Sequence, residues 1–428
     1  MFKKRIFVLA AALLLTVTLS SCALLQSFDF SNLGGKSDLP STVERLLRGY
    51  SYYGYELNDE QLAKAIVAQY ANDTGDRYAY YYNAEEYKAL TADNAGENQG
   101  IGITITENSE YKCIEIISVL PGSPALKAGI KAGDLIVAVG VGENAESVSE
   151  LGYELAVKKL QGTNGTLCEF SAVRGEDFDS PIEFSVMREK FISQSVMYAV
   201  SHADPSVGIV KILEFDLTTP TQFRSAMEEL ISKGCKSFIY DVRNNPGGDL
   251  NSVSAVLSFF YNDGDIIIRT RYRDESESDM EIRYCKPVSY TGTYEGCSVA
   301  KEDIAKYREY PAAILANENT ASAGELFTCG MKDYGIATVV GTTTYGKGCM
   351  QSIISLEKFD LPGAMKMTTA FYYPPLSDNY HEIGISPDEG YEQELSDAAK
   401  KVNIYSLLEE NQDLDNQLAL AITALKNK

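Results

Sequence analysis

The chain has 428 residues, 45% of them hydrophobic and 23% charged, which is ordinary for a globular protein and long enough for two to four domains. Its 60 acidic and 38 basic residues give a net charge of −22, which argues against nucleic acid or an anionic lipid surface as a partner. With only two histidines and no Cys-x-x-Cys pair, a zinc site is not expected.

The first 22 residues have the pattern of an export signal. Basic residues at positions 3–5 precede an almost wholly apolar stretch, 6–18, which is shorter than the roughly 20 residues needed to span a bilayer. Leu-Ser-Ser before Cys22 resembles the lipobox of bacterial lipoproteins. This resemblance implies a lipid anchor on Cys22 and a place in the cell envelope, on the outer face of the cytoplasmic membrane. An ordinary signal peptide is the alternative, and in either case the polar residues 23–40 are expected to form a tether.

Residues 41–98 are predicted to form a small helical segment. Apolar residues recur at helical spacing in 42–50 and again in 60–70. From Gln99 the pattern changes to short alternating strands, so a domain boundary is expected there.

Residues 99–190 resemble a PDZ domain, most clearly in the run Pro-Gly-Ser-Pro-Ala to Gly-Asp-Leu-Ile over 121–136. The resemblance implies a groove helix over 148–160. Backbone N–H groups around Gly100 to Gly102 are expected to hold a peptide's terminal carboxylate while the following strand pairs with the peptide. A β-rich spacer without a ligand is the alternative. The residues expected to bind the peptide are Gly100, Ile101, Gly102 and Ile103.

Residues 191–390 are predicted to form an α/β domain. Buried strands over 206–213 and 236–242 flank a helix over 220–233, which makes a β-α-β unit. A sharp turn, Asp-Val-Arg-Asn-Asn-Pro-Gly-Gly, ends at Gly248, where glycines allow backbone N–H groups to face a ligand.

Residues 269–310 are polar and acidic, and we expect them to be an insertion that leaves the sheet of this α/β domain. Seven cysteines remain after Cys22, so at least one free thiol is expected if Cys22 is lipidated and no intermolecular disulfide forms. Cys285 and Cys297 both lie in the insertion and are the first pair to test for a disulfide.

Ser322 and Lys347 are the candidate nucleophile and base. Ser322 lies where the apolar run 312–316 gives way to a helical pattern, so its side chain is expected beside unpaired helix N–H groups. Lys347 follows 25 residues later, enough for the helix and a strand to lead the chain back. His202 and His381 are interpreted as structural, which leaves few candidates for a Ser/His/Asp triad.

A lysine base must be neutral, and its ordinary pKa is about 10.4, so burial has to lower that pKa. Gly346 and Gly348 allow the backbone to pack closely enough for such burial.

Three motifs in this order and spacing resemble the carboxyl-terminal processing peptidases, or tail-specific proteases. They are Asp-Val-Arg-Asn-Asn-Pro-Gly-Gly at 241–248, Asn-Thr-Ala-Ser-Ala-Gly-Glu at 319–325 and Tyr-Gly-Lys-Gly-Cys-Met-Gln at 345–351. The resemblance implies an α+β or α/β multidomain protein. Its parts would be a crotonase-like β-β-α spiral peptidase core, an inserted PDZ domain and terminal helices.

The resemblance also implies a mechanism. Ser322 would attack the peptide carbonyl, Lys347 would accept the serine proton, and Gln351 would orient Lys347. The amides of Gly248, helped by Gly247, and of Ala323 would form the oxyanion hole. No metal or organic cofactor is implied. The substrates would be proteins or peptides with free, apolar C-termini.

Several alternatives stay open at this point. A catalytically silent PDZ scaffold would keep the same motifs, and an acyl-CoA enzyme is conceivable because crotonases use the same type of core. Cys349 stands where a serine is expected from the family pattern, and as an alternative nucleophile it would also depend on Lys347. The C-terminal helical segment, 391–428, is expected to pack with the N-terminal helices or with a second subunit of a homodimer.

Overall fold

The computed structural model describes residues 43–44, 48, 58–108, 111–120, 122–175, 178, 180–192, 194–273, 276, 279–286, 299–402, 407–408 and 410–426. The chain divides into two compact units, Met1–Tyr81 and Tyr82–Lys428. The predicted export signal, Cys22 and the tether lie outside the described residues. Among the residues that are described, no helix is long and apolar enough to cross a membrane.

The described part of the first unit contains helix α3 (Asp59–Thr74), and strand β1 (Tyr80–Tyr82) lies at the boundary. The Asn58 side chain accepts from the N–H of Gln61, and the Gln61 side chain accepts from the N–H of Asn58. Gly75 ends the helix in the left-handed conformation, with φ of 77°. Helix α3 therefore confirms the helical pattern predicted for 60–70.

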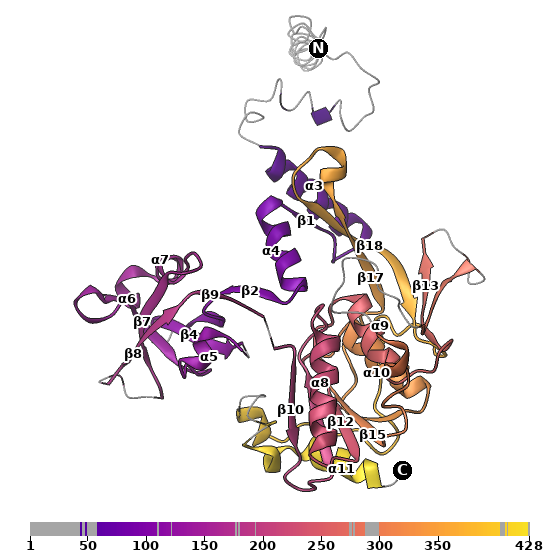
Figure 1. The fold of residues 1–428 in the computed structure, drawn as a ribbon. Helices are drawn as coiled ribbons and strands as arrows, with labels where there is room; N and C mark the ends of the chain where they lie inside the picture. The colour runs from indigo at the N-terminus through magenta and orange to yellow at the C-terminus, as the bar shows by residue number, and fades with distance from the viewer. Residues whose placement is uncertain are drawn as a thin grey trace, which may run out of the picture. The chain divides into compact units, whose positions relative to one another are not determined.

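The PDZ region is an antiparallel sheet covered by short helices (Figure 1). The predicted groove helix is interrupted at Gly152, which has φ of 78° and separates α6 from α7. Buried apolar side chains of the strands and of α7, such as Ile114, Phe170 and Ala156, form one core. The sheet order is β3 (Ile103–Asn108), β4 (Cys113–Val119), β5 (Leu135–Val139), β7 (Leu167–Val173) and β8 (Ile182–Met187), with β6 (Glu146–Ser147) beside β5 and with helices α5 (Pro124–Lys127), α6 (Val148–Leu151) and α7 (Tyr153–Leu160).

A two-stranded antiparallel ribbon joins the two ends of the PDZ region. It pairs β2 (Glu97–Gly100) with β9 (Glu189–Ile192). Helix α4 (Ala84–Asn94) precedes the ribbon.

The second unit is built on a five-stranded sheet with strand order β10-β11-β12-β15-β16. Only the β10–β11 pair is antiparallel, and the other neighbours are parallel. Helices cover both faces, so every residue of β11 and β15 is buried, as expected for a parallel sheet. The strands are β10 (Val196–Val200), β11 (Val207–Ile212), β12 (Ser237–Asp241), β15 (Ala312–Ala316) and β16 (Ala337–Gly341).

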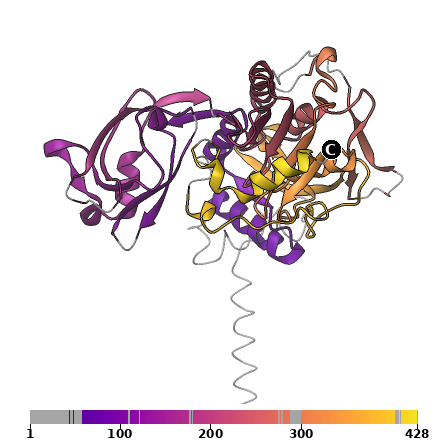
Figure 2. The ribbon, with the colours of Figure 1, turned by 90° about the horizontal axis from the view of Figure 1, so that it is seen from below.

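The two faces of this sheet use alternate residues of each strand. Val210, Tyr240 and Ile314 belong to a core that also contains residues of α8 (Thr219–Ser232), α9 (Leu250–Ser258) and α10 (Ala323–Asp333). Their neighbours Ile209, Ile239 and Leu315 pack instead against α11 (Asn416–Lys426). Figure 2 shows α11 in yellow. The apolar face of α11 thus covers the sheet of its own unit, which the sequence did not predict, and packing of the C-terminal segment on the N-terminal helices or on a second subunit stays a prediction.

A second, antiparallel sheet has strand order β14-β13-β18-β17. Its strands are β13 (Ile266–Tyr272), β14 (Glu281–Tyr284), β17 (Cys349–Ser355) and β18 (Ala364–Tyr373). Strand β13 includes the first residues of the predicted insertion 269–310, and Val299 and Tyr307 are buried in the main core. The inserted segment is therefore shorter than the predicted 269–310, because residues at both ends of that range belong to the folded core.

The predicted pair Cys285 and Cys297 is not supported at Cys285. Its thiol is free and buried, and it contacts the carbonyl oxygen of Tyr261 at 3.7 Å. Cys297 lies outside the described residues. The side chain of Cys285 packs in the core, where it is a small apolar residue rather than half of a surface crosslink.

Candidate active site

Ser322 has a strained backbone at the junction of β15 and α10. Its φ of 54° and ψ of −116° lie outside the regions that L-residues ordinarily adopt, and such strain is often found at functional sites. The Ser322 N–H donates to Glu325 Oε2 at 2.9 Å, and its carbonyl oxygen accepts from the N–H of Leu326. These bonds fix the backbone, so the half-buried side chain is presented at the start of α10.

Lys347 lies in the loop between β16 and β17, and its glycine neighbours allow the close packing predicted for them. A Cβ on Gly346 would lie 3.0 Å from the backbone nitrogen of Gly384, and one on Gly348 would lie 2.9 Å from that of His381. Larger residues would push the loop away from the segment against which it packs. The Lys347 side chain is half-buried.

The Glu325 carboxylate connects the serine to the lysine loop. Oε2 accepts from the N–H of Lys347 at 2.7 Å as well as from that of Ser322. Oε1 accepts from the N–H of Gly346 and from Thr344 Oγ1, each at 2.6 Å. The residue is 0% exposed, and burial raises the pKa of its carboxyl group while the four hydrogen bonds oppose that shift. We call this arrangement the Glu325 clamp.

The sequence analysis gave Glu325 no role. Its position three residues after Ser322 matches the second half of a capping box, and this signal alone would have placed its carboxylate near the Ser322 N–H. The contacts with Thr344, Gly346 and Lys347 come from the tertiary fold and have no local signal.

Tyr372, on β18, was also missed. Its hydroxyl lies 3.2 Å from Ser322 Oγ and donates to the carbonyl oxygen of Lys347 at 2.9 Å. The side chain is 4% exposed, and burial raises the pKa of its phenol well above the usual value. It comes from a strand 50 residues after the serine, so nothing in the local sequence pointed to it.

A cavity of about 340 Å³ brings the predicted residues together. It contains Ser322 and Lys347, and part of its wall is apolar. Its lining includes Gly248, Ala323, Gln351, Cys349 and Tyr372, with Leu250, Leu326, Met350 and Ile353 among the apolar residues.

The predicted oxyanion donors lie beside Ser322. A Cβ on Gly247 would be 2.7 Å from Ser322 Cβ and 2.9 Å from the backbone nitrogen of Ala323, which shows how closely the turn approaches the start of α10. Ala323 is the first residue of α10, where helix N–H groups lack partners within the helix. Within the described part of the chain, no backbone carbonyl accepts from the N–H of Gly248 or Ala323.

Gln351 lies on the wall of the cavity. Its Nε2 donates to Cys349 Sγ at 3.2 Å and to Thr368 Oγ1 at 3.3 Å. Cys349 is buried, and its sulfur thus helps to hold the Gln351 amide. The role of Gln351 in orienting Lys347 stays a prediction.

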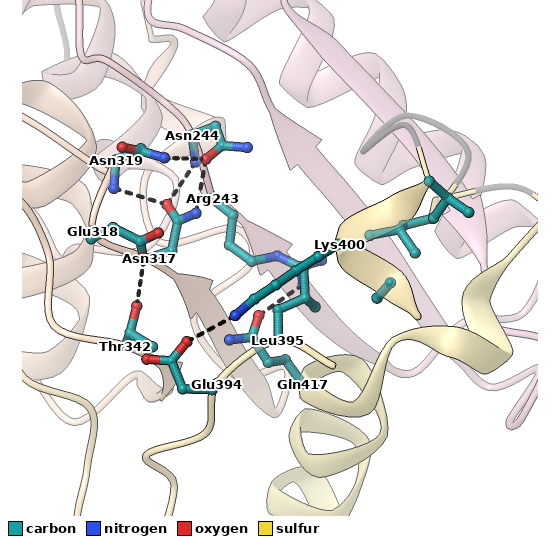
Figure 3. A pocket seen from close by; sticks show the side chains of 13 residues that line it. Arg243, Asn244, Asn317, Glu318, Asn319, Thr342, Glu394, Leu395, Lys400 and Gln417 are labelled. Atoms are coloured by element: carbon teal, nitrogen blue, oxygen red, sulfur yellow. Dashed lines mark hydrogen bonds and ion pairs between the residues drawn. The ribbon is translucent and has the colours of Figure 1, made fainter. Parts of the chain in front are cut away.

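The two loops that carry the turn and the serine are joined by asparagines (Figure 3). The Asn244 N–H donates to Asn317 Oδ1 at 2.9 Å, and Asn244 Oδ1 accepts from Asn317 Nδ2 at 2.8 Å and from Asn319 Nδ2 at 3.0 Å. Asn244 has φ of 61°, a left-handed conformation that asparagine tolerates. These residues line a second cavity, of about 280 Å³, at the carboxyl ends of β12, β15 and β16.

The four residues predicted to bind a peptide, Gly100 to Ile103, line a third cavity of about 420 Å³ in the PDZ region. Opposite them, Val157 and Leu160 of α7 form an apolar wall. In the described chain β3 pairs only with β4, so its other edge borders the cavity. An extended peptide could pair with that edge.

Neither histidine lines the Ser322 cavity. The backbone N–H of His202 donates to Gln412 Oε1, and the backbone N–H of His381 donates to Asn379 Oδ1. The His381 ring packs edge-on against Phe371. These contacts agree with the structural interpretation of both residues.

Comparison with known proteins defines the class. The family model described as "Peptidase family S41" matches residues 206–391, and the model described as "PDZ domain" matches residues 90–168. The fold resembles the crystal structure of a putative S41 protease from Bacteroides fragilis, with a TM-score of 0.53 and 17% identity over 92% of this chain and 98% of that one. A mixed α/β, crotonase-like peptidase core with a PDZ domain is thus shown, as predicted.

Two curated relatives agree with this class. A "Carboxy-terminal-processing protease" of Bartonella bacilliformis is 29% identical over 333 residues, which are 77% of this chain and 69% of the relative. The "Carboxy-terminal processing protease CtpA" of Bacillus subtilis is 26% identical over 404 residues, 93% of this chain and 79% of the relative. Residues 206–391 match peptidase family S41, and the chain is a serine-type peptidase with a PDZ domain. The predicted family and enzyme class are confirmed, and the acyl-CoA alternative has no support.

Proposed function

We propose that Ser322 and Lys347 are the catalytic dyad of this carboxyl-terminal processing peptidase. The observation that supports this most directly is that both residues line one cavity while a single carboxylate, Glu325, holds the backbone N–H of each. One buried group therefore holds the two backbone segments that carry the proposed nucleophile and base.

The proposed reaction is peptide-bond hydrolysis through an acyl-enzyme. As Ser322 Oγ forms a bond to the carbonyl carbon, its proton passes to Lys347 Nζ and the C=O π pair moves onto the carbonyl oxygen. The N–H groups of Gly248 and Ala323 stabilise that oxyanion, and loss of one such donor typically costs about 3 kcal/mol. When the C–N bond breaks, the lysine ammonium returns the proton to the leaving amine. A water molecule then repeats the sequence at the ester carbonyl, while Gln351 orients Lys347.

The cavity wall suggests which side chain is accepted beside the cleaved bond. Leu250, Leu326 and Met350 form an apolar surface next to Ser322. We infer that an aliphatic side chain occupies it, because burying such a side chain removes apolar area from water. The PDZ groove would select chains by their free, apolar C-terminus.

Export and anchoring remain proposals. The leader pattern before Cys22 supports a lipid anchor at the cell envelope, with the cytoplasmic membrane's outer face as the site of action. Metabolic labelling with a clickable fatty acid should mark the wild-type chain, whereas Cys22→Ala should lose the label. Labelling of both would show that Cys22 is not the anchor. A homodimer is likewise a proposal, which comes from the helical pattern of the C-terminal segment 391–428, and light scattering of the purified protein tests it.

The deciding assay is cleavage of an unstructured peptide with an apolar C-terminus. Ser322→Ala and Lys347→Ala should each lose nearly all activity, whereas Lys358→Ala, an exposed lysine outside the cavity, should behave as wild type. Equal turnover by all four proteins would exclude the dyad. No turnover by wild type, with intact peptide binding, would support the silent scaffold.

A further inference from the structure

The Tyr372 hydroxyl touches both halves of the proposed dyad. It lies 3.2 Å from Ser322 Oγ and 2.9 Å from the carbonyl oxygen of Lys347. The lysine loop is thus held from two sides, with its N–H on the Glu325 clamp and its carbonyl on Tyr372.

The number of protons decides the direction of these two hydrogen bonds. A phenol has one proton, and a carbonyl oxygen can only accept. The proton of Tyr372 is therefore directed at Lys347, and Ser322 must be the donor in its contact with Tyr372. In the resting enzyme the phenol oxygen is an acceptor for the serine hydroxyl.

This arrangement must reverse when Ser322 loses its proton to Lys347 Nζ. The serine oxygen then carries developing negative charge and can only accept. The phenol proton needs only a rotation about the C–O bond to turn from the Lys347 carbonyl to Ser322 Oγ, with no bond broken in the tyrosine.

We propose that Tyr372 is a further catalytic residue, which donates a hydrogen bond to Ser322 Oγ as charge develops there. The hydrogen bond would exist in the transition state and not in the ground state, so it lowers the barrier rather than strengthening substrate binding. This role rests on the proposed function of Ser322 and Lys347.

The surroundings of Tyr372 suit a neutral donor in a fixed place. Burial raises the pKa of the phenol, so it keeps its proton at neutral pH. The Tyr372 carbonyl accepts from Asn379 Nδ2, and its N–H donates to the Gly348 carbonyl at 3.2 Å. Its ring packs edge-on against that of Tyr380, with 6.1 Å between centroids.

The test compares Tyr372→Phe with Tyr373→Phe, which removes a phenol hydroxyl from the next residue of the same strand, outside the cavity. For both variants kcat and KM are measured on the peptide substrate. The rate at which an alkyl fluorophosphonate labels Ser322 is measured alongside, with the adduct located by mass spectrometry. For Tyr372→Phe we expect kcat and the labelling rate to fall together by about 10- to 100-fold, with KM within about twofold. Tyr373→Phe should stay within about twofold of wild type in all three.

Fluorotyrosines at position 372 provide a second measurement that keeps the ring and its packing. Successive fluorination makes the phenol a stronger donor, so kcat should rise from tyrosine to mono- and difluorotyrosine. A flat series, or a Tyr372→Phe variant within twofold of wild-type kcat, would overturn the proposal. If wild type forms no adduct at Ser322, the proposed dyad is wrong. That outcome is distinguishable from failure of the Tyr372 proposal, in which the adduct still forms.

Discussion

Glu325 Oε1 accepts a hydrogen bond from Thr344 Oγ1 at 2.6 Å, with both side chains buried. This bond ties α10, which directly follows the proposed nucleophile, to the loop that carries the proposed base. Because the other three hydrogen bonds of the Glu325 clamp come from backbone N–H groups, Thr344 supplies the one contact of the clamp that a side-chain substitution removes. Thr344 Oγ1 also accepts from the backbone N–H of Ile385 at 2.8 Å, so a substitution there removes that bond too.

Replacing Thr344 by Val should therefore lower kcat by about tenfold or more, because the lysine loop loses a hydrogen bond to a charged acceptor. Thr342→Val is the matched control, since Thr342 donates to the exposed Glu318. Steady-state kinetics on the peptide substrate measure both variants. Equal effects in the two would show that the Glu325 clamp does not position Lys347.

The hydrogen bond between Thr344 and Glu325 also predicts a shift in the acidic side of the pH–activity profile. Burial raises the pKa of Glu325, and the hydrogen bond from Thr344 is among the contacts that lower it. A protonated Glu325 cannot accept all four hydrogen bonds, so activity should fall as pH falls through that pKa. Thr344→Val removes a lowering contact, so the acidic side of the profile should move to higher pH. A pH profile of kcat/KM that keeps its midpoint would contradict this.

Gly247→Ala should abolish most activity. The new Cβ would press on Ser322 Cβ and the Ala323 nitrogen at a residue with φ of 109°. Displacing the oxyanion donors is expected to cost about 100-fold in kcat or more. Gly264→Ala is the control, because Gly264 also has positive φ (92°) but open space around its Cβ. It should cost stability in a thermal melt and leave kcat unchanged, and a similar kcat loss in both would point to backbone strain alone.

Asp415→Asn should destabilise the fold by about 3–5 kcal/mol, because the buried Arg243 guanidinium would lose a charge partner. Burial alone would raise the pKa of Asp241 in the same cluster, yet Arg243 and Lys211 hold it below its usual range. A carboxyl with a lowered folded-state pKa contributes stability above about pH 4, and this contribution is lost as pH falls further. Chemical denaturation between pH 3 and 7 measures both effects. Asp415 immediately precedes α11. If Asp415→Asn leaves the denaturation midpoint unchanged, α11 is held to the sheet by its apolar face alone.

Ile105→Lys should raise KM for peptides with free apolar C-termini by about tenfold, since Ile105 lines the apolar PDZ groove. Thr104→Lys, on the exposed face of the same strand, serves as the control. Amidating the peptide's C-terminus should erase the difference between the two variants. If Ile105→Lys leaves KM unchanged, the groove does not select substrates.

Local patterns predicted most of the fold. Buried β-strands are short apolar runs, so β11, β12 and β15 could be located from the sequence, and the glycine turn before α9 was recognised by its motif. The placement of α11 could not be inferred, because an amphipathic helix shows that it has a partner but not which one. The ends of the insertion were missed because polar composition hides single buried residues such as Tyr307.

The residues of the candidate site likewise fall into those that local patterns revealed and those that only the tertiary fold brings in. Ser322, Lys347 and Gly248 lie in recognisable motifs, whereas Tyr372 and Thr344 act through contacts between segments distant in sequence. A hydroxyl that reaches across from another strand leaves no periodicity or spacing to detect. Such residues become visible only when the strands are placed.

The hydrogen bonds among Asn244, Asn317 and Asn319 join the glycine turn to the serine loop without any contribution from substrate. The proposed oxyanion donors are thus in position before a peptide arrives, and the ordering of these loops is complete once the chain has folded. In the proposed mechanism each catalytic cycle would begin with a preorganised anion site, and control would act on what reaches the cavity and on the proton of Lys347.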